Sequence, residues 1–548
     1  MKRLSLLIGM LLGMAVLVGT VVFASPYRPA ARMCPEDIQE IWDIEDVRTQ
    51  SEKPLVTALE NSGVPLAYDT ERNTFYCTLG LGHAEEWPEI SIRTSGNSGE
   101  ISLVFIDDFA YDACADAISS GYSYEMMAYT DSEYDYFNVV FTGIPILHLS
   151  ADEKMTREDT PSHVVLSTYG EPVVSLNARA HLRGGVSSGS EKKGYRVEYT
   201  RSREGGKIQW HTPGLGLTDT ILLLPMVYDR LLMRDRLSWD LFGKIKDEGA
   251  PFGARASAYA EVFVNGRYEG VYLMLTPFDE EAEISKKSRE LLQTSGVYRT
   301  CVQYLIRDEL MCPHPYKESS GYRLFYTSPE REPFAMLDTY LSAITETNDD
   351  IFCEKMLKHF DLNDMMTTQL LIQAGGMSDN VFNNLYIWAE KTPQGEMYHY
   401  FPWDMDMAWG MKMEDIGERY ERWLCFPPMD RLLNLNPDGQ IRRQFGETWS
   451  YLRNTVLNKK QIASLLDDYV HELNDSGAML RNAERWEKED YQTDPALINE
   501  FVEVRLNVLD EAIDYIAASD GPIDFLMKSN YTDKSVSMGN EDETALIQ

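Results

Sequence analysis

The spacing of apolar residues changes from strand-like to helix-like along the chain, and this change most constrains the fold. Before residue 280 the pattern predicts strands at 144–149, 163–168, 195–199 and 221–224. A hairpin is predicted over 261–275, because Asn265-Gly266 at its centre favours a two-residue turn.

Later segments repeat their apolar residues at helical spacing. One predicted helix, at 231–245, interrupts the strand-rich part, and the others follow residue 330. These later helices are predicted at 334–345, 362–374, 441–456, 460–473 and 495–517. Between them, residues 385–388 and 397–401 are predicted to pair as strands. A β-rich first part followed by a helical second part indicates an α+β fold.

The first 24 residues have the form of an export signal. Charged residues at Lys2 and Arg3 precede a stretch that is almost entirely apolar and uncharged as far as Ala24. The same stretch is long enough to remain as a membrane anchor. We therefore predict a signal peptide or anchor at 1–24, with the body of the protein extracytoplasmic. It would be secreted or attached to the cell surface through this segment.

The chain is strongly acidic. It has 51 Lys and Arg residues against 87 Asp and Glu, and removal of Lys2 and Arg3 would leave 49 against 87, a net charge near −38. Such a charge excludes nucleic acid as a partner and argues against docking on anionic lipid. Contact with a membrane is therefore expected only through an uncleaved N-terminal segment. The charge suits a protein that binds divalent cations.

The remaining composition divides the body into three parts. Residues 34–142 contain short β-rich runs separated by Gly, Asn and Ser, which indicates a small accessory β-rich or α+β module. Within it, Cys77 could form a disulfide with Cys114. Residues 143–518 form the main domain, and 519–548 are a polar tail.

Asp404 and Asp406 are the most conspicuous candidates for chemistry. They lie two residues apart in an apolar and aromatic run over 400–410. If that run is a strand, both carboxylates point to the same face and repel each other unless a cation joins them. The alternative is a solvated turn with an Asp cap.

A second polar cluster precedes this pair. Asp379 is followed five positions later by Asn384, and Asp404 comes after the predicted pair of strands. This order is similar to that of phosphoryl-transfer enzymes of the protein-kinase type, in which a loop Asp, an Asn and a later Asp serve catalysis and metal binding. The alternative is a polar loop with Asx turns.

The third candidate is a basic loop over 183–196, rich in Gly and Ser. Small residues let backbone N–H groups approach a phosphate closely. Lys193 is predicted to share a strand face with Tyr195 and Val197, which would turn it inward, and Lys192 to face the other way. The alternative is a flexible solvated hairpin.

Five segments in this order resemble the spore coat protein H (CotH) kinase family, over about residues 143–518. They are Arg183-Gly184 with Lys192-Lys193-x-Tyr195-Arg196, Asp229 with Leu232-Met233-Arg234-Asp235, Val264-Asn265-Gly266-x-Tyr268-x-Gly270-Val271-Tyr272-Leu273, Asp379 with Asn383-Asn384, and Pro402-Trp403-Asp404-Met405-Asp406.

The resemblance implies an atypical protein-kinase-like fold that uses ATP and Mg²⁺ or Mn²⁺. It implies that Asp379 is the catalytic carboxylate and Lys193 the catalytic lysine that contacts phosphate. The other implied site residues are Arg183, Lys192 and Arg234 for the nucleotide, and Asn384, Asp404 and Asp406 for the metal.

The chain departs from the family pattern at Gly185, Asp235 and Thr276, where the family has Asn, Asn and Glu. The first hypothesis is an exported kinase that phosphorylates Ser or Thr of cell-surface or spore-coat proteins. The second is a kinase-like structural or adhesive surface protein without turnover. The third is a carbohydrate-active enzyme, because paired carboxylates near Trp403 and Trp409 could serve a sugar cleft.

Overall fold

The computed structural model describes most of the chain between residues 31 and 527. The described residues are 31–32, 38–81, 90–92, 101–106, 114–184, 189–246, 255–278, 295–300, 318–319, 322–327, 332, 334–411, 423–424, 426–487 and 490–527. The predicted signal peptide or anchor at 1–24, Gly185 and the tail beyond residue 527 lie outside them. No helix within those ranges has the length and apolar character needed to cross a bilayer.

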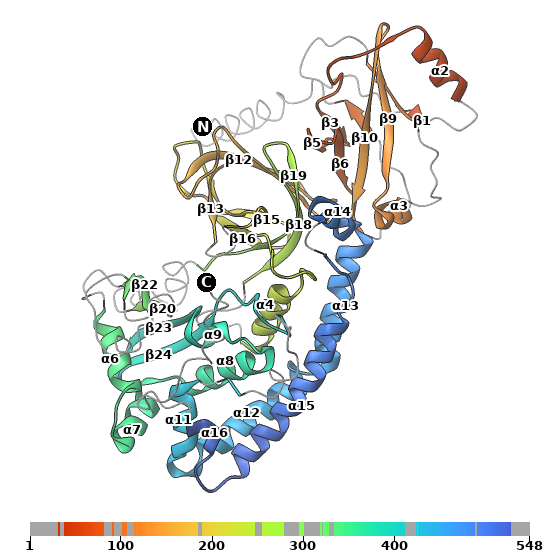
Figure 1. The fold of residues 1–548 in the computed structure, drawn as a ribbon. Coiled ribbons are helices and arrows are strands. Elements are labelled where there is room, and N and C mark those ends of the chain that lie inside the picture. Colours follow the sequence, from red (N-terminus) through yellow and green to blue (C-terminus); the bar gives the residue numbers. More distant parts are fainter. Residues whose placement is uncertain are drawn as a thin grey trace, which may run out of the picture.

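The first part of the chain forms a mixed sheet with its own apolar core (upper right in Figure 1). In spatial order its strands are β1 (Ala31–Arg32), β8 (Ser102–Phe105), β9 (Ser123–Tyr129), β10 (Glu133–Thr142), β6 (Thr74–Thr78) and β5 (Ala67–Asp69), with β2 (Thr49–Gln50) beside β10. A separate small sheet contains β4 (Val64–Pro65), β3 (Leu59–Asn61) and β7 (Ile90–Ile92). Two helices, α2 (Ile38–Asp46) and α3 (Cys114–Ser120), belong to the same part of the chain. Cys77 is a buried thiol whose sulfur accepts a hydrogen bond from Asn61 Nδ2, so the predicted pairing of Cys77 with Cys114 is wrong.

The second part is a closed seven-stranded barrel. In order around it the strands are β11 (Ile146–Ala151), β12 (Thr160–Ser167), β13 (Val174–Arg183), β14 (Gly194–Thr200), β17 (Thr220–Leu224), β19 (Arg267–Leu275) and β18 (Ser257–Val264). A short hairpin, β15 (Trp210–Thr212) and β16 (Gly216–Thr218), lies beside it. Alternate residues such as Val197 and Tyr199 fill the interior. The predicted strands and the 261–275 hairpin are confirmed, with Asn265 and Gly266 both at positive φ.

The third part combines a five-stranded sheet with a layer of helices (lower half of Figure 1). The strands, in order, are β21 (Glu318–Ser319), β22 (Tyr322–Thr327), β20 (Gly296–Thr300), β23 (Leu385–Thr392) and β24 (Gly395–Pro402). The helices are α6 (Ala335–Ile344), α7 (Asp349–His359), α8 (Leu362–Gly375), α9 (Asp379–Phe382), α11 (Pro427–Leu435), η5 (Pro437–Gly439), α12 (Ile441–Thr455), α13 (Lys459–Asp475), α14 (Ala478–Arg485), α15 (Ala496–Ala518) and α16 (Asp524–Met527). All five helices predicted in this part are confirmed, as α6, α8, α12, α13 and α15.

Two features join the parts. Helix α4 (Arg234–Ile245), predicted from its apolar spacing, follows the barrel strand β17 and packs against α8 and α13. Tyr76 of the first sheet places its ring 4.9 Å from Phe263 and 5.1 Å from Tyr268 of the barrel (centroid distances). Helix α13 runs upward in Figure 1 to α14, which contacts β19. The first sheet and α14 thus contact the same barrel strand, β19, and α4 leads from the barrel into the helical part.

Candidate functional site

The acidic pair lies in a turn and not in a strand. Strand β24 ends at Pro402, and Asp404 adopts a left-handed φ of 55° that a strand does not allow. The condition for Asp404 and Asp406 to share a strand face is therefore not met, and the alternative of a turn holds, with Asp404 exposed and Asp406 half-buried. The strand geometry that made the two carboxylates compatible with sugar chemistry is therefore absent from this turn. The expectation that the pair directly follows the β23–β24 hairpin is confirmed.

Asp379 is the first residue of the short helix α9, and two amides hold its carboxylate. Asn384 Nδ2 donates to Asp379 Oδ2 at 2.6 Å, and Asn383 Nδ2 lies 3.2 Å from both oxygens. Asn384 has φ 53°, which turns its side chain back toward Asp379. The carboxylate is thus fixed as an acceptor at the edge of the hairpin.

Backbone contacts fasten this segment to the acidic turn. Trp403 N donates to Asn384 O at 2.8 Å, and the buried side chain of Asn380 donates through Nδ2 to Trp403 O at 2.7 Å. These bonds bring the Asp379 segment and the Asp404 turn, which the sequence separates by a whole hairpin, onto one surface.

Helix α4 packs directly against the same turn. Ser238 Oγ donates to Met405 O at 3.2 Å and accepts from Trp409 Nε1 at 2.8 Å. The rings of Trp239 and Trp403 meet edge to face at 5.4 Å. The first turn of α4 carries Asp235, whose side chain is 4% exposed. A fourth carboxylate therefore joins Asp379, Asp404 and Asp406.

Burial and the neighbouring acids raise the pKa values of Asp235 and Asp406. Burial, with repulsion by Asp404, raises the pKa of Asp235 to about 7, although Arg183 opposes the shift. Burial also holds the pKa of Asp406 well above its usual range, reinforced by Asp404, Asp235 and Asp379. Neighbouring like charges in a desolvated site favour the protonated form unless a cation enters.

Arg183 is the residue through which the barrel reaches this acidic site. Burial lowers its pKa, and the charges of Asp404 and Asp235 oppose that shift, so the guanidinium lies within electrostatic range of both. Arg183 ends β13 and pairs in register with Gly194, the first residue of β14. The two ends of the predicted Gly/Ser loop are therefore at the acidic site.

The two lysines of that loop exchange their predicted orientations. Strand β14 begins at Gly194, so Lys193 precedes it, is partly exposed, and donates to Ser190 O at 2.6 Å. Lys192 is the buried one, and the inward orientation predicted for Lys193 is wrong. The Lys192 ammonium donates to Val271 O at 2.6 Å and Asn482 Oδ1 at 3.1 Å, and lies 4.8 Å from the Tyr272 ring centroid.

Arg234, predicted to contact nucleotide, forms a buried ion pair with Asp229. Asp229 Oδ2 also accepts from Met233 N and Arg234 N, both at 2.7 Å, so this carboxylate caps the start of α4. Its charge contributes to the raised pKa of Asp406. Arg234 and Asp229 thus form part of the wall of the site.

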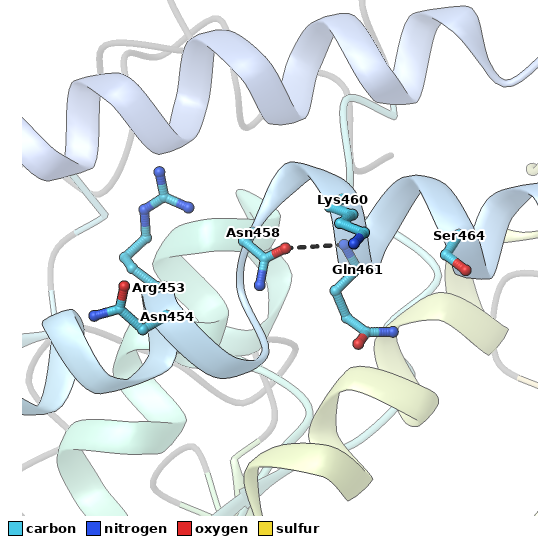
Figure 2. Close-up of a pocket in the computed structure, with 6 residues that line it drawn as sticks. All are labelled: Arg453, Asn454, Asn458, Lys460, Gln461 and Ser464. Carbon is cyan, nitrogen blue, oxygen red and sulfur yellow. Dashed lines mark hydrogen bonds between the residues drawn. The ribbon is translucent and has the colours of Figure 1, made fainter.

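A separate cleft of about 430 Å³ lies where α12 is followed by α13 (Figure 2). It is lined by Arg453, Asn454, Asn458, Lys460, Gln461 and Ser464. Its polar groups serve the helices, since Asn458 Oδ1 caps α13 by accepting from Gln461 N at 2.9 Å and Arg453 is bonded to Asp510. It contains none of the predicted site residues.

The sequence identified Asp379, Asn384, Asp404, Asp406 and Arg183, which the structure brings together. It noted Asp235 only as a departure from a pattern and missed Ser238. The signal for Asp235 was its place in the first turn of a predicted helix, directly after Arg234. Within the described ranges, no three His, Cys, Asp or Glu side chains are arranged closely enough to enclose a metal by themselves.

Comparison with known proteins agrees with these motifs. The family model described as CotH kinase protein matches residues 180–509, which include the end of β13 at Arg183, the acidic turn and most of the helical part. A search of curated proteins gives no match. Because the matched segment spans more than half of the chain, this protein belongs to the CotH kinase family.

Proposed function

We propose that this protein is an atypical protein kinase that transfers the γ-phosphoryl group of ATP to Ser or Thr of cell-surface or spore-coat proteins. The observation that carries the proposal is the meeting of Asp379, Asn384 and the Asp404 turn with Arg183 from the barrel. In the kinase-like arrangement that we propose, the barrel is the nucleotide-side lobe and the helical part is the substrate-side lobe.

The donors at this site fit Mg²⁺ or Mn²⁺. Carboxylate and amide oxygens are the ligands that these cations prefer. Asn384 directs its amide nitrogen to Asp379, which leaves its Oδ1 to act as a ligand. Asp404 and Asp406 would complete the protein donors. A cation would relieve the carboxylate repulsion that adds to burial in raising the pKa of Asp406. A bound divalent cation would neutralise charge on the phosphates and fix their orientation.

Each side chain has a role that follows from its contacts. Asp379, held by Asn383 and Asn384, would accept the proton of the substrate hydroxyl. Arg183 is placed to stabilise charge on the transferred group, and Lys193 is the cation proposed to contact phosphate. Lys192 and Arg234, both buried in bonded positions, would support the loop and α4 from behind.

The location of the substrates rests on the N-terminal segment. If residues 1–24 direct export, the kinase meets proteins outside the cytoplasm, either secreted or attached to the cell surface. Comparing the N-terminus of the protein from culture medium and membrane fractions tests this part of the proposal separately from activity.

Phosphoryl transfer is tested with the full chain, γ-labelled ATP, Mn²⁺ or Mg²⁺, and a mixture of surface proteins. We expect Asp379→Asn and Asp404→Asn to lower the rate by about 10²–10⁴-fold, as for loss of a catalytic base or metal ligand. Asp467→Asn, an exposed acid-to-amide change on α13, should retain the wild-type rate. Equal labelling by all three variants would refute the assignment.

A further inference from the structure

Asp235 is a buried acid that the site as proposed above does not use. Its side chain is 4% exposed, and Oδ1 makes no hydrogen bond to any described residue. The indole of Trp239, one turn along α4, is near enough to favour the charged form, but its Nε1 is itself without a hydrogen bond. A carboxylate in such a position is costly unless a ligand reaches it.

The packing of α4 aims this carboxylate at the acidic turn. Ser238, three positions further along the helix, contacts both Met405 O and Trp409 Nε1. Residues three apart lie on one helix face, and side chains tilt toward the helix N-terminus. Asp235 therefore lies on the helix face that covers the turn, within electrostatic range of Asp404.

The charges of the site are unbalanced. Asp406 lies within electrostatic range of four other carboxylates, Asp404, Asp235, Asp379 and Asp229. Arg183 opposes Asp404 and Asp235, whereas the guanidinium of Arg234 is bonded to Asp229. Five carboxylates thus face the guanidinium groups of Arg183 and Arg234, with Arg196 within electrostatic range of Arg183, and negative charge is in surplus. Asp235 is buried there, whereas Asp404 is exposed and can be reached from solvent. A divalent cation would balance this surplus before nucleotide binds.

We propose that Asp235 and Asp404 together bind a divalent cation in the nucleotide-free protein, at a position additional to the nucleotide-linked metal at Asn384, Asp404 and Asp406. Mg²⁺ and similar hard cations commonly take one or two carboxylates and complete their shell with water, so a third acid is not required. The inference rests on the proposed function only in that both use Asp404. An Asn at position 235 would supply a neutral and weaker ligand.

The test measures Mn²⁺ binding to the full chain without nucleotide, from the loss of the free-ion electron paramagnetic resonance signal. We expect wild type to bind Mn²⁺, and Asp235→Asn and Asp404→Asn to weaken binding at least tenfold. Asp467→Asn on α13 should bind as wild type does. Equal binding by wild type and Asp235→Asn, or none by wild type, would overturn the inference.

Folding of the variants is checked by thermal unfolding with and without Mn²⁺. Asp235→Asn should melt at a higher temperature than wild type in chelator, because it removes a repelled buried charge, and should gain less from Mn²⁺. Wild-type Mn²⁺ binding without phosphoryl transfer would leave this inference standing and reject the kinase proposal. Transfer that persists in a protein with no nucleotide-free Mn²⁺ site would do the reverse.

Discussion

Buried charge is handled in opposite ways at two places beside the barrel. Where α14 meets the barrel, Glu261 is wholly buried and receives Arg481 Nε and Nη2 at 2.8 and 2.9 Å and the Tyr268 hydroxyl at 2.5 Å. At the acidic site, Asp235 is about as deeply buried but has no such partner, and its nearest charged neighbours include other acids.

This difference separates a structural charge from a functional one. The Glu261–Arg481 pair joins the barrel to α14, and the attraction between its charges offsets the cost of removing them from water. Neither side chain is therefore available to bind a ligand. The acidic site keeps its carboxylates close together at the expense of stability. Perturbed acids in such a setting are characteristic of binding and catalytic sites.

The largest effect expected from this comparison follows removal of one member of the compensated pair. Arg481→Ala would leave Glu261 buried and unpaired, and we expect it to lower the free energy of unfolding by about 3–5 kcal/mol. Denaturant unfolding of the full chain measures this. The double variant Glu261→Gln with Arg481→Met should recover much of the loss. A single variant as stable as wild type would show that the pair does not hold α14 to the barrel.

Local sequence rules predicted the elements of the fold that obey a simple period. The β23–β24 pair and the amphipathic helix α12 are examples. Helix α8 is buried on nearly all sides, and it is delimited as its residues suggest, by the Asp361 cap and by Gly376 in the left-handed region. Helix α14 was not predicted, because it has only eight residues and depends on distant contacts through Arg481 and Asn482.

At the site, the alternation of side chains along a strand does not describe two of the predicted orientations. A period-two argument fails for Asp404 because the aromatic run continues past the end of the strand, and fails for Lys193 because β14 begins one residue later. Spacing indicated the residue types correctly at both places. Only the three-dimensional packing of α4 against the turn brings Asp235 to the site, and nothing local in the sequence specifies that contact.

The second prediction concerns the uncompensated region and its dependence on pH. The pKa of Asp235 is about 7 in the folded protein and near 4 when unfolded, so the folded state holds the proton more tightly. Its contribution to the free energy of unfolding is therefore full below pH 4 and is lost as pH rises to 7. We expect Asp235→Asn, which cannot ionise, to exceed wild type by about 2–4 kcal/mol at pH 8 in chelator.

Comparison at low pH provides the control. Near pH 4 the wild-type side chain is protonated and resembles Asn, so the two proteins should unfold at the same denaturant concentration. The difference should appear between pH 4 and 7. A difference that is constant with pH would mean that repulsion at Asp235 is not its source, and that the contrast between the two regions is one of packing.

The smallest effect is expected at Lys192, a buried cation that polar groups and an aromatic ring surround. Lys192→Met keeps the apolar stem and the contact with Tyr272, and Asn482 Oδ1 retains its bond from Val271 N at 3.0 Å. We expect a loss of about 1 kcal/mol in the free energy of unfolding, because mainly the ammonium bonds disappear. Affinity for a fluorescent ATP analogue should stay within about threefold of wild type, since that corresponds to less than 1 kcal/mol.

Lys193→Met, the matched neighbour, should show the opposite result, with stability unchanged and nucleotide affinity reduced. A tenfold loss of affinity in Lys192→Met at unchanged stability would instead place the Lys192 ammonium on the phosphates and return it to the binding role that the sequence predicted.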